Sequence, residues 1–170
     1  SEYSLSDGII RIKELVSRAS SLQYSAVGLT DLTNLFGLLE FYRSSREKGI
    51  KPIVGAEVNV IKDKDSLPAP IVLLVKDKQG YINLTKIVSK AYVDGQVNGE
   101  PMVELSLLQK YSEGLIALSG GMEGHVGQSI LAGNIPLTES RIKFFKSIFD
   151  EDFFIEVHRL GKTNEEEYNN

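Results

Sequence analysis

The stretch Ile71-Val72-Leu73-Leu74-Val75 is the clearest strand in this sequence, and it is apolar at every position. A short run without polar alternation is typical of a strand that is buried on both faces. Strands of this kind occur in sheets that are covered by helices. The segments on either side of this run therefore decide the fold class.

Two further strands are predicted on the amino-terminal side, at 26–29 and 52–60. Residues 9–19 carry apolar side chains at helical spacing, and we expect Asp7-Gly8 to cap that helix. Thr30-Asp31 is expected to close the first strand and to cap a second helix, which ends near Gly49. The inner side of that second helix is predicted to carry Leu35, Leu38, Leu39, Phe41 and Tyr42.

The same alternation continues on the carboxyl-terminal side of the apolar stretch. A helix is predicted at 80–92, and its inward residues are Ile82, Leu84, Ile87, Val88 and Ala91. The rest of the chain is predicted as a loop at 94–101, helices at 103–111, 124–133 and 137–148, and strands at 115–118 and 153–157. Short strands separated by helices predict an α/β fold with a mostly parallel sheet. Periodicity alone leaves a doubly wound sheet and a barrel as alternatives.

Composition excludes several classes of function. The chain of 170 residues has 19 basic and 23 acidic residues, a formal net charge of −4, so a basic surface for free nucleic-acid binding is not expected. The absence of cysteine excludes disulfides and thiolate metal sites. We find no run of about 18 apolar residues and no signal-peptide pattern, so a cytoplasmic protein without a membrane partner is expected.

Three local patterns, taken together in their order and spacing, resemble one known family. They are the segments 1–8, 28–42 and 49–58, which read SEYSLSDG, GLTDLTNLFGLLEFY and GIKPIVGAEV. Later segments at 73–84, 114–121 and 154–169 continue the likeness. The chain resembles the PHP domain at the start of the bacterial DNA polymerase III alpha subunit, over nearly its whole length.

The resemblance implies a fold and a domain assignment. PHP domains form a distorted (β/α)7 barrel with ligands at the carboxyl ends of the strands, as in other barrels. Residues 1–170 are then expected to be the amino-terminal part of a single PHP domain, an incomplete barrel within a larger polymerase chain. Members that keep their site bind a metal cluster that hydrolyses phosphoesters, a reaction that clustered divalent metals promote.

The resemblance also implies that this metal site has degenerated. The family's opening His-x-His pair has no counterpart at or after Ser1. Asp7 and Glu57 match carboxylate ligands, whereas ligand positions are lost at Leu32, Pro70 and Gly121. Two carboxylates without imidazole are a poor site for transition metals. The sequence of residues 29–34 resembles that of a family branch that lost the metal site. We therefore expect no catalytic, cofactor-binding or metal-binding residue in this chain.

Structural explanations compete with functional ones at several residues. Asp7 and Asp31 are interpreted as caps, and Glu57 as a buried carboxylate paired with another protein group. His125 is interpreted as a surface residue or a cap, and His158 as a structural residue. The glycine-rich stretch 120–127 lacks the spacing of a phosphate-binding loop and is interpreted as a tight turn.

These features lead to one main hypothesis and two alternatives. The main hypothesis is a non-catalytic scaffold and docking site for the proofreading exonuclease subunit. Nucleotidyl transfer with Mg and contact with DNA then belong to the remainder of the polymerase alpha subunit. The first alternative is a metal-dependent PHP phosphoesterase, motivated by Asp7 and Glu57. The second is a generic α/β binding domain unrelated to replication.

Overall fold

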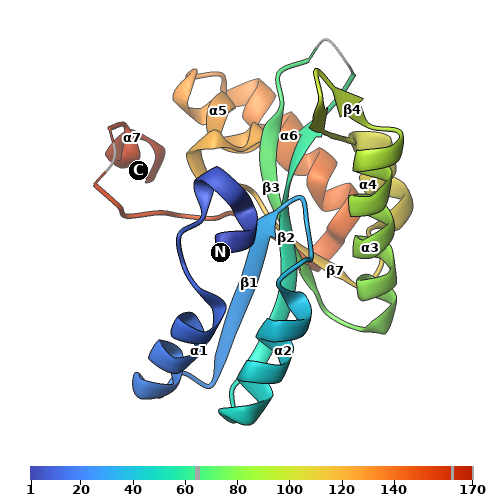
Figure 1. Cartoon of the computed structure of the whole chain (residues 1–170). Coiled ribbons are helices and arrows are strands. Elements are labelled where there is room, and N and C mark those ends of the chain that lie inside the picture. Colours follow the sequence, from blue (N-terminus) through green and yellow to red (C-terminus); the bar gives the residue numbers. More distant parts are fainter. Residues whose placement is uncertain (64–65, 162, 170) are drawn as a thin grey trace.

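The computed structural model describes residues 1–63, 66–161 and 163–169, with the backbone alone for residues 5–7. Its centre is a six-stranded sheet (Figure 1). The strand order is β1-β2-β3-β7-β8, and β6 pairs with the far end of β2. The strands are β1 (Ala26–Leu32), β2 (Lys51–Ile61), β3 (Ala69–Val75), β6 (Val103–Glu104), β7 (Leu115–Leu118) and β8 (Phe153–Phe154).

One strand of this sheet runs against the others. β1 and β6 are parallel to β2, whereas β3 is antiparallel to both β2 and β7, and β8 is parallel to β7. Every strand of the sheet except β3 therefore has the same direction, which confirms the predicted α/β fold with a mostly parallel sheet. β3 is reversed because only residues 62–68 connect it to β2, and a parallel crossover needs a dozen or more residues.

Helices surround the sheet, and their positions agree with the sequence pattern (Figure 1). They are α1 (Ile12–Ser21), α2 (Leu38–Glu47), α3 (Lys78–Val93), α4 (Leu105–Tyr111), α5 (His125–Leu131), α6 (Ile135–Phe149) and α7 (Glu165–Asn169). Short 3-10 helices occur at η1 (Glu2–Asp7), η2 (Gly121–Glu123) and η3 (Asp150–Asp152). Residues 96–101 form a small hairpin of β4 (Gln96–Val97) and β5 (Glu100–Pro101) where a loop was predicted.

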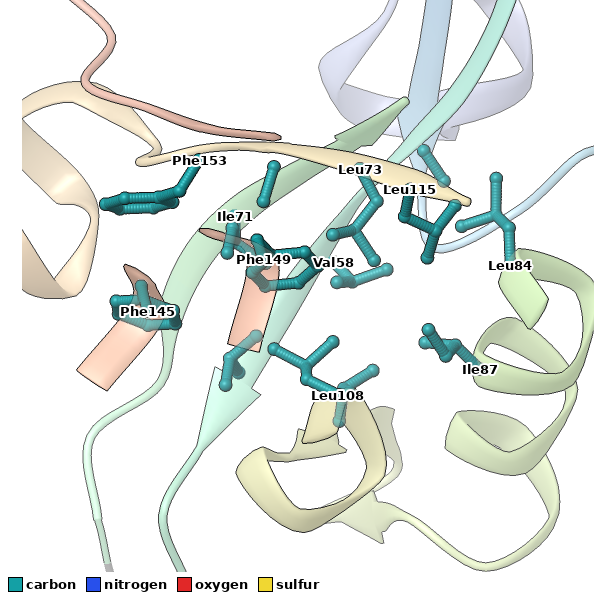
Figure 2. Close-up of a cluster of buried hydrophobic side chains, with 14 of the residues drawn as sticks. Val58, Ile71, Leu73, Leu84, Ile87, Leu108, Leu115, Phe145, Phe149 and Phe153 are labelled. Carbon is teal, nitrogen blue, oxygen red and sulfur yellow. The ribbon is translucent and has the colours of Figure 1, made fainter. Parts of the chain in front are cut away.

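Buried side chains form two separate clusters. The larger cluster lies between the sheet and helices α3 to α6, and Figure 2 shows Val58 and Leu73 of the sheet pointing toward Leu84 and Ile87 of α3. Phe145 of α6 stacks on Phe153 of β8 with ring centroids 5.3 Å apart. The smaller cluster joins α1, β1 and α2 around the fully buried Phe41.

Several details of the sequence prediction were wrong. α1 begins at Ile12, and its N-cap residue Arg11 provides no side-chain cap, so the expected cap at Asp7-Gly8 is not used. Leu39, Tyr42 and Ile82 were predicted to point inward but are exposed. The last strand ends at Phe154 rather than at 157. Leu39 and Tyr42 line a groove at the surface instead of joining a buried cluster.

Candidate functional site

The carboxyl end of β1 is bound to the first residues of the chain by a buried carboxylate. Asp31 accepts hydrogen bonds from the hydroxyl groups of Ser1 and Ser4, each at 2.8 Å, and it is almost fully buried. The Ser4 hydroxyl in turn accepts from the amide of Leu32 at 3.1 Å. Asp31 lies inside β1 and α2 begins only at Leu38, so the predicted cap role of Asp31 is wrong.

Asn34 makes a second connection at the same place. Its side-chain amide donates to the carbonyl oxygens of Tyr3 and Leu32 at 2.9 and 3.0 Å, and its own oxygen accepts from the amide of Phe36 at 3.1 Å. Two of the three segments that suggested the family, 1–8 and 28–42, are therefore in direct contact. The side chains of Ser4, Asp31 and Asn34 hold η1 on the end of β1.

The positions of the family's metal ligands converge at this end of the sheet. Leu32 is the register partner of Glu57 in the β1–β2 pair, and Pro70 lies at the start of β3. A cavity of about 200 Å³ opens there. Its lining consists of Glu57, Pro70, Gly120, Met122, Glu123, Glu156, His158 and Leu160. The side chain of Asp7 lies outside the part of the structure that is described.

The imidazole ring of His158 occupies the space into which a side chain at position 121 would project. Gly121 has a φ of 58°, and a Cβ placed on it would lie 2.9 Å from Cε1 and Nδ1 of His158. The His158 ring is also within 2.9 Å of a carboxylate oxygen of Glu156. His158 was predicted to be structural, but its position beside Gly121 could not be read from the sequence. The two residues are distant in the chain, and no motif links them.

The carboxyl-terminal helix holds this imidazole-bearing segment in place. The Tyr168 hydroxyl donates to the carbonyl oxygen of Glu156 at 2.6 Å, and Asn169 donates to that of His158 at 2.8 Å. Glu165 accepts from the amides of Leu160 and Gly161 at 2.7 and 2.8 Å. Burial raises the pKa of Tyr168, so its phenol stays a hydrogen-bond donor at neutral pH.

The residues present do not fit a metal cluster. Leu32 and Pro70 offer no side-chain donor atom, and Gly121 has no side chain at all. Across the described residues, no group of three or more His, Cys, Asp or Glu side chains is close enough to hold a metal ion. Leu32, Pro70 and Gly121 therefore add no ligand to the carboxylates and the imidazole that line the cavity.

The glycine-rich stretch is a turn that presses closely on its neighbours. A Cβ on Gly120 would lie 2.2 Å from the carbonyl oxygen of Pro70, and one on Gly124 would lie 1.7 Å from that of Ser119. This close approach of backbone to backbone accounts for the glycines, as the sequence interpretation proposed.

His125 differs from its predicted role as a surface residue or cap. It is half-buried at the start of α5, and its Nε2 lies 3.2 Å from the carbonyl oxygen of Val60. Its ring stacks on Phe145 with centroids 6.2 Å apart. Burial, and then the charge of Arg141, lower the pKa of His125.

The chain matches the PHP domain family over residues 1–160. It is 39% identical to the DNA polymerase III subunit alpha of Vibrio cholerae over 170 residues, which is 99% of this chain and 15% of that protein. The Escherichia coli K12 subunit of the same name is 41% identical, with the same shares covered. The chain thus spans about 15% of the length of these relatives.

Among solved structures, an amidohydrolase from Chromobacterium violaceum is 20% identical with a TM-score of 0.43, and the match covers 87% of this chain and 47% of that one. In the described residues we find no helix that is both long and apolar enough to span a membrane.

Proposed function

The chain belongs to the PHP domain family, and from this premise we propose that it is a non-catalytic scaffold and docking module of a DNA polymerase III alpha subunit. Residues 1–170 are, in this proposal, the amino-terminal part of a single PHP domain in a longer polymerase chain. Nucleotidyl transfer, its Mg ions and the contacts to DNA belong to the remainder of that cytoplasmic subunit.

The observation that carries the non-catalytic part is the set of side chains at the end of the sheet. Leu32 and Pro70 have hydrocarbon side chains. The space beside Gly121 is occupied by the imidazole of His158, which is paired with Glu156. Divalent transition metals need nitrogen, oxygen or sulfur donors in a fixed arrangement, and the residues Leu32, Pro70 and Gly121 supply no side-chain donor atom. The cavity is, in this proposal, a remnant of the family's site without a catalytic role.

Calorimetric titration of Zn, Mn and Mg into the full-length protein tests this proposal. We expect no binding that depends on Glu57, so wild type, Glu57→Ala and the exposed control Glu47→Ala should give the same heats. Tight binding that is lost in Glu57→Ala alone would overturn the non-catalytic assignment.

A metal-dependent phosphoesterase is the second candidate, and one observation favours it. Glu57, Glu123, Glu156 and His158 line the same cavity, so this end of the sheet still carries groups that can bind cations. Phosphatase assays with added Mn, Zn or Mg separate the two candidates. Activity that disappears in Glu57→Ala would support the phosphoesterase, whereas its absence under all three metals would support the scaffold.

An exposed apolar groove supports the docking part of the proposal. The groove lies between α2 and α3, has a volume of about 490 Å³, and is lined by Leu35, Phe36, Leu38, Leu39, Tyr42, Val54, Val75 and Tyr81. Phe36 and Leu39 expose 73% and 60% of their surface. Contiguous apolar surface with aromatic side chains is typical of protein interfaces. We assign this groove to the proofreading exonuclease subunit.

A pull-down with the exonuclease subunit tests this assignment. We expect Phe36→Ser and Tyr42→Ser to weaken capture at least tenfold, because central aromatic residues dominate interface energies. Val93→Ser, which changes an exposed side chain at the end of α3 outside the groove, is the matched control. Undiminished capture by both groove variants would exclude the groove as the docking surface.

A further inference from the structure

A second cavity lies between α4, α5 and α6, away from the cavity that Glu57 and His158 line. Its volume is about 720 Å³, within the range of pockets that bind small molecules. Leu105, Leu137, Phe144 and Phe145 supply most of its apolar wall, and Arg141 and His125 lie on the same lining.

Arg141 is a side chain on this lining whose charge has no acidic partner among the described residues. The Arg141 side chain is partly exposed, and its guanidinium donates through one nitrogen to the carbonyl oxygen of His125. In residues 1–63, 66–161 and 163–169 it forms no salt bridge, although Lys76, Lys90 and Lys143 each have an acidic partner. Burial lowers the pKa of Arg141, yet an arginine stays charged in a protein.

An arginine at the edge of an apolar cavity can pair with an anion that enters it, and the attraction is stronger there than in bulk water because the cavity excludes part of the water. Arginine has five N–H donors in a planar fork, and the bond to His125 uses only part of them. The remaining donors match the two oxygens of a carboxylate.

The other charged residue on the cavity lining is positive, as Arg141 is. Lys62 is a second cationic residue on the cavity, and no acidic side chain occurs among the described residues that line it. Gln109 and Gln128 add amide donors. This arrangement contrasts with the chain as a whole, whose net charge is −4.

We propose that this cavity binds a small amphipathic anion, namely an aliphatic or aromatic body that carries one carboxylate. The carboxylate pairs with Arg141, and the body packs on Leu105, Leu137 and Phe144. This inference is independent of the docking and scaffold roles, because it concerns different residues.

The test is calorimetric titration of octanoate into the full-length protein, with octylammonium as a ligand of equal chain length and opposite charge. We expect saturable binding of octanoate and none of octylammonium. Arg141→Gln should raise the dissociation constant of octanoate at least tenfold. Lys143→Gln, on the same helix with a side chain that is 78% exposed, should leave it unchanged.

A separate variant keeps the test decisive if the loss of Arg141 unfolds α5. Leu137→Gln alters the apolar wall at a partly exposed position, and it should also weaken octanoate binding. Equal binding of octanoate and octylammonium by the wild-type protein, or no octanoate binding at all, would overturn the proposal. So would an Arg141→Gln protein that is folded and binds octanoate as the wild type does.

Discussion

Both the backbone conformation and the lack of space for a Cβ require glycine at position 120. Its φ is 76°, a conformation that is costly for residues with a Cβ, and the carbonyl oxygen of Pro70 occupies the space of that Cβ. Gly133 has a similar φ of 64° but open space around it. The pair therefore separates the cost of backbone conformation from the cost of crowding.

We expect Gly120→Ala to lower the free energy of unfolding by about 3 kcal/mol, because strain and overpacking add. Gly133→Ala should cost only about 1 kcal/mol, from the backbone conformation alone. Urea unfolding of the two variants measures both values. Equal losses would mean that the turn moves away from β3 at little cost.

His125 should make stability depend on pH. Its pKa is below the ordinary value of 6.5 in the folded chain, so around and below that pH the unfolded chain binds more protons. The free energy of unfolding therefore has its full value above pH 6.5 and decreases as the pH falls below that value. Urea unfolding between pH 8 and pH 5 should show this loss in wild type and in His158→Gln, but less of it in His125→Gln. If the free energy of unfolding of His125→Gln depended on pH as strongly as that of the wild type, His125 would not be the source of the dependence.

Among the elements, α7 has an effect larger than its length indicates. Glu165 is buried, and its carboxylate accepts from the amides of Leu160 and Gly161. Tyr168 and Asn169 bind the same segment from the next turn. The segment that carries His158 is thus held by side chains of one short helix.

Replacing Glu165 should release that segment. We expect Glu165→Ala to speed hydrogen exchange of the Leu160 and Gly161 amides at least tenfold, because both lose their acceptor. Glu166→Ala, an exposed neighbour in the same turn, is the control and should leave both rates unchanged. Equal rates in the two variants would show that other contacts hold the segment.

For the molecule as a whole, the two core clusters predict two levels of stability. Phe41 is fully buried with Ile12 and Val16 in the smaller cluster, which shares no buried residue with the larger one. The α1–β1–α2 part therefore has its own apolar contacts, and its link to the rest is mainly the β1–β2 pairing.

Phe41→Ala should destabilise the smaller cluster by about 3 to 5 kcal/mol, the usual cost of removing a buried phenylalanine. Hydrogen exchange should rise first in α1 and α2 and stay slow in α3. The control Leu73→Ala lies in the larger cluster and should instead raise exchange in α3. A uniform increase in both variants would show that the whole molecule opens as one unit.

The sequence determined the fold class, the family and the positions of the main helices and strands, because these depend on local patterns. The apolar run 115–118, for example, coincides with strand β7. The motif segments 1–8 and 28–42 can be recognised in the amino-acid sequence alone. The absence of donor atoms at Leu32 and Pro70 was equally evident, since the residue type alone decides it.

Only the tertiary structure decided which distant groups meet. Asp31 matched the pattern of a helix cap, but burial against Ser1 and Ser4 gives it a different set of partners. The place of His158 beside Gly121, and that of Arg141 in an apolar cavity, depend on packing between elements far apart in the chain. Local periodicity carries no information on such contacts, because the sheet and its connections bring them together only when the chain folds.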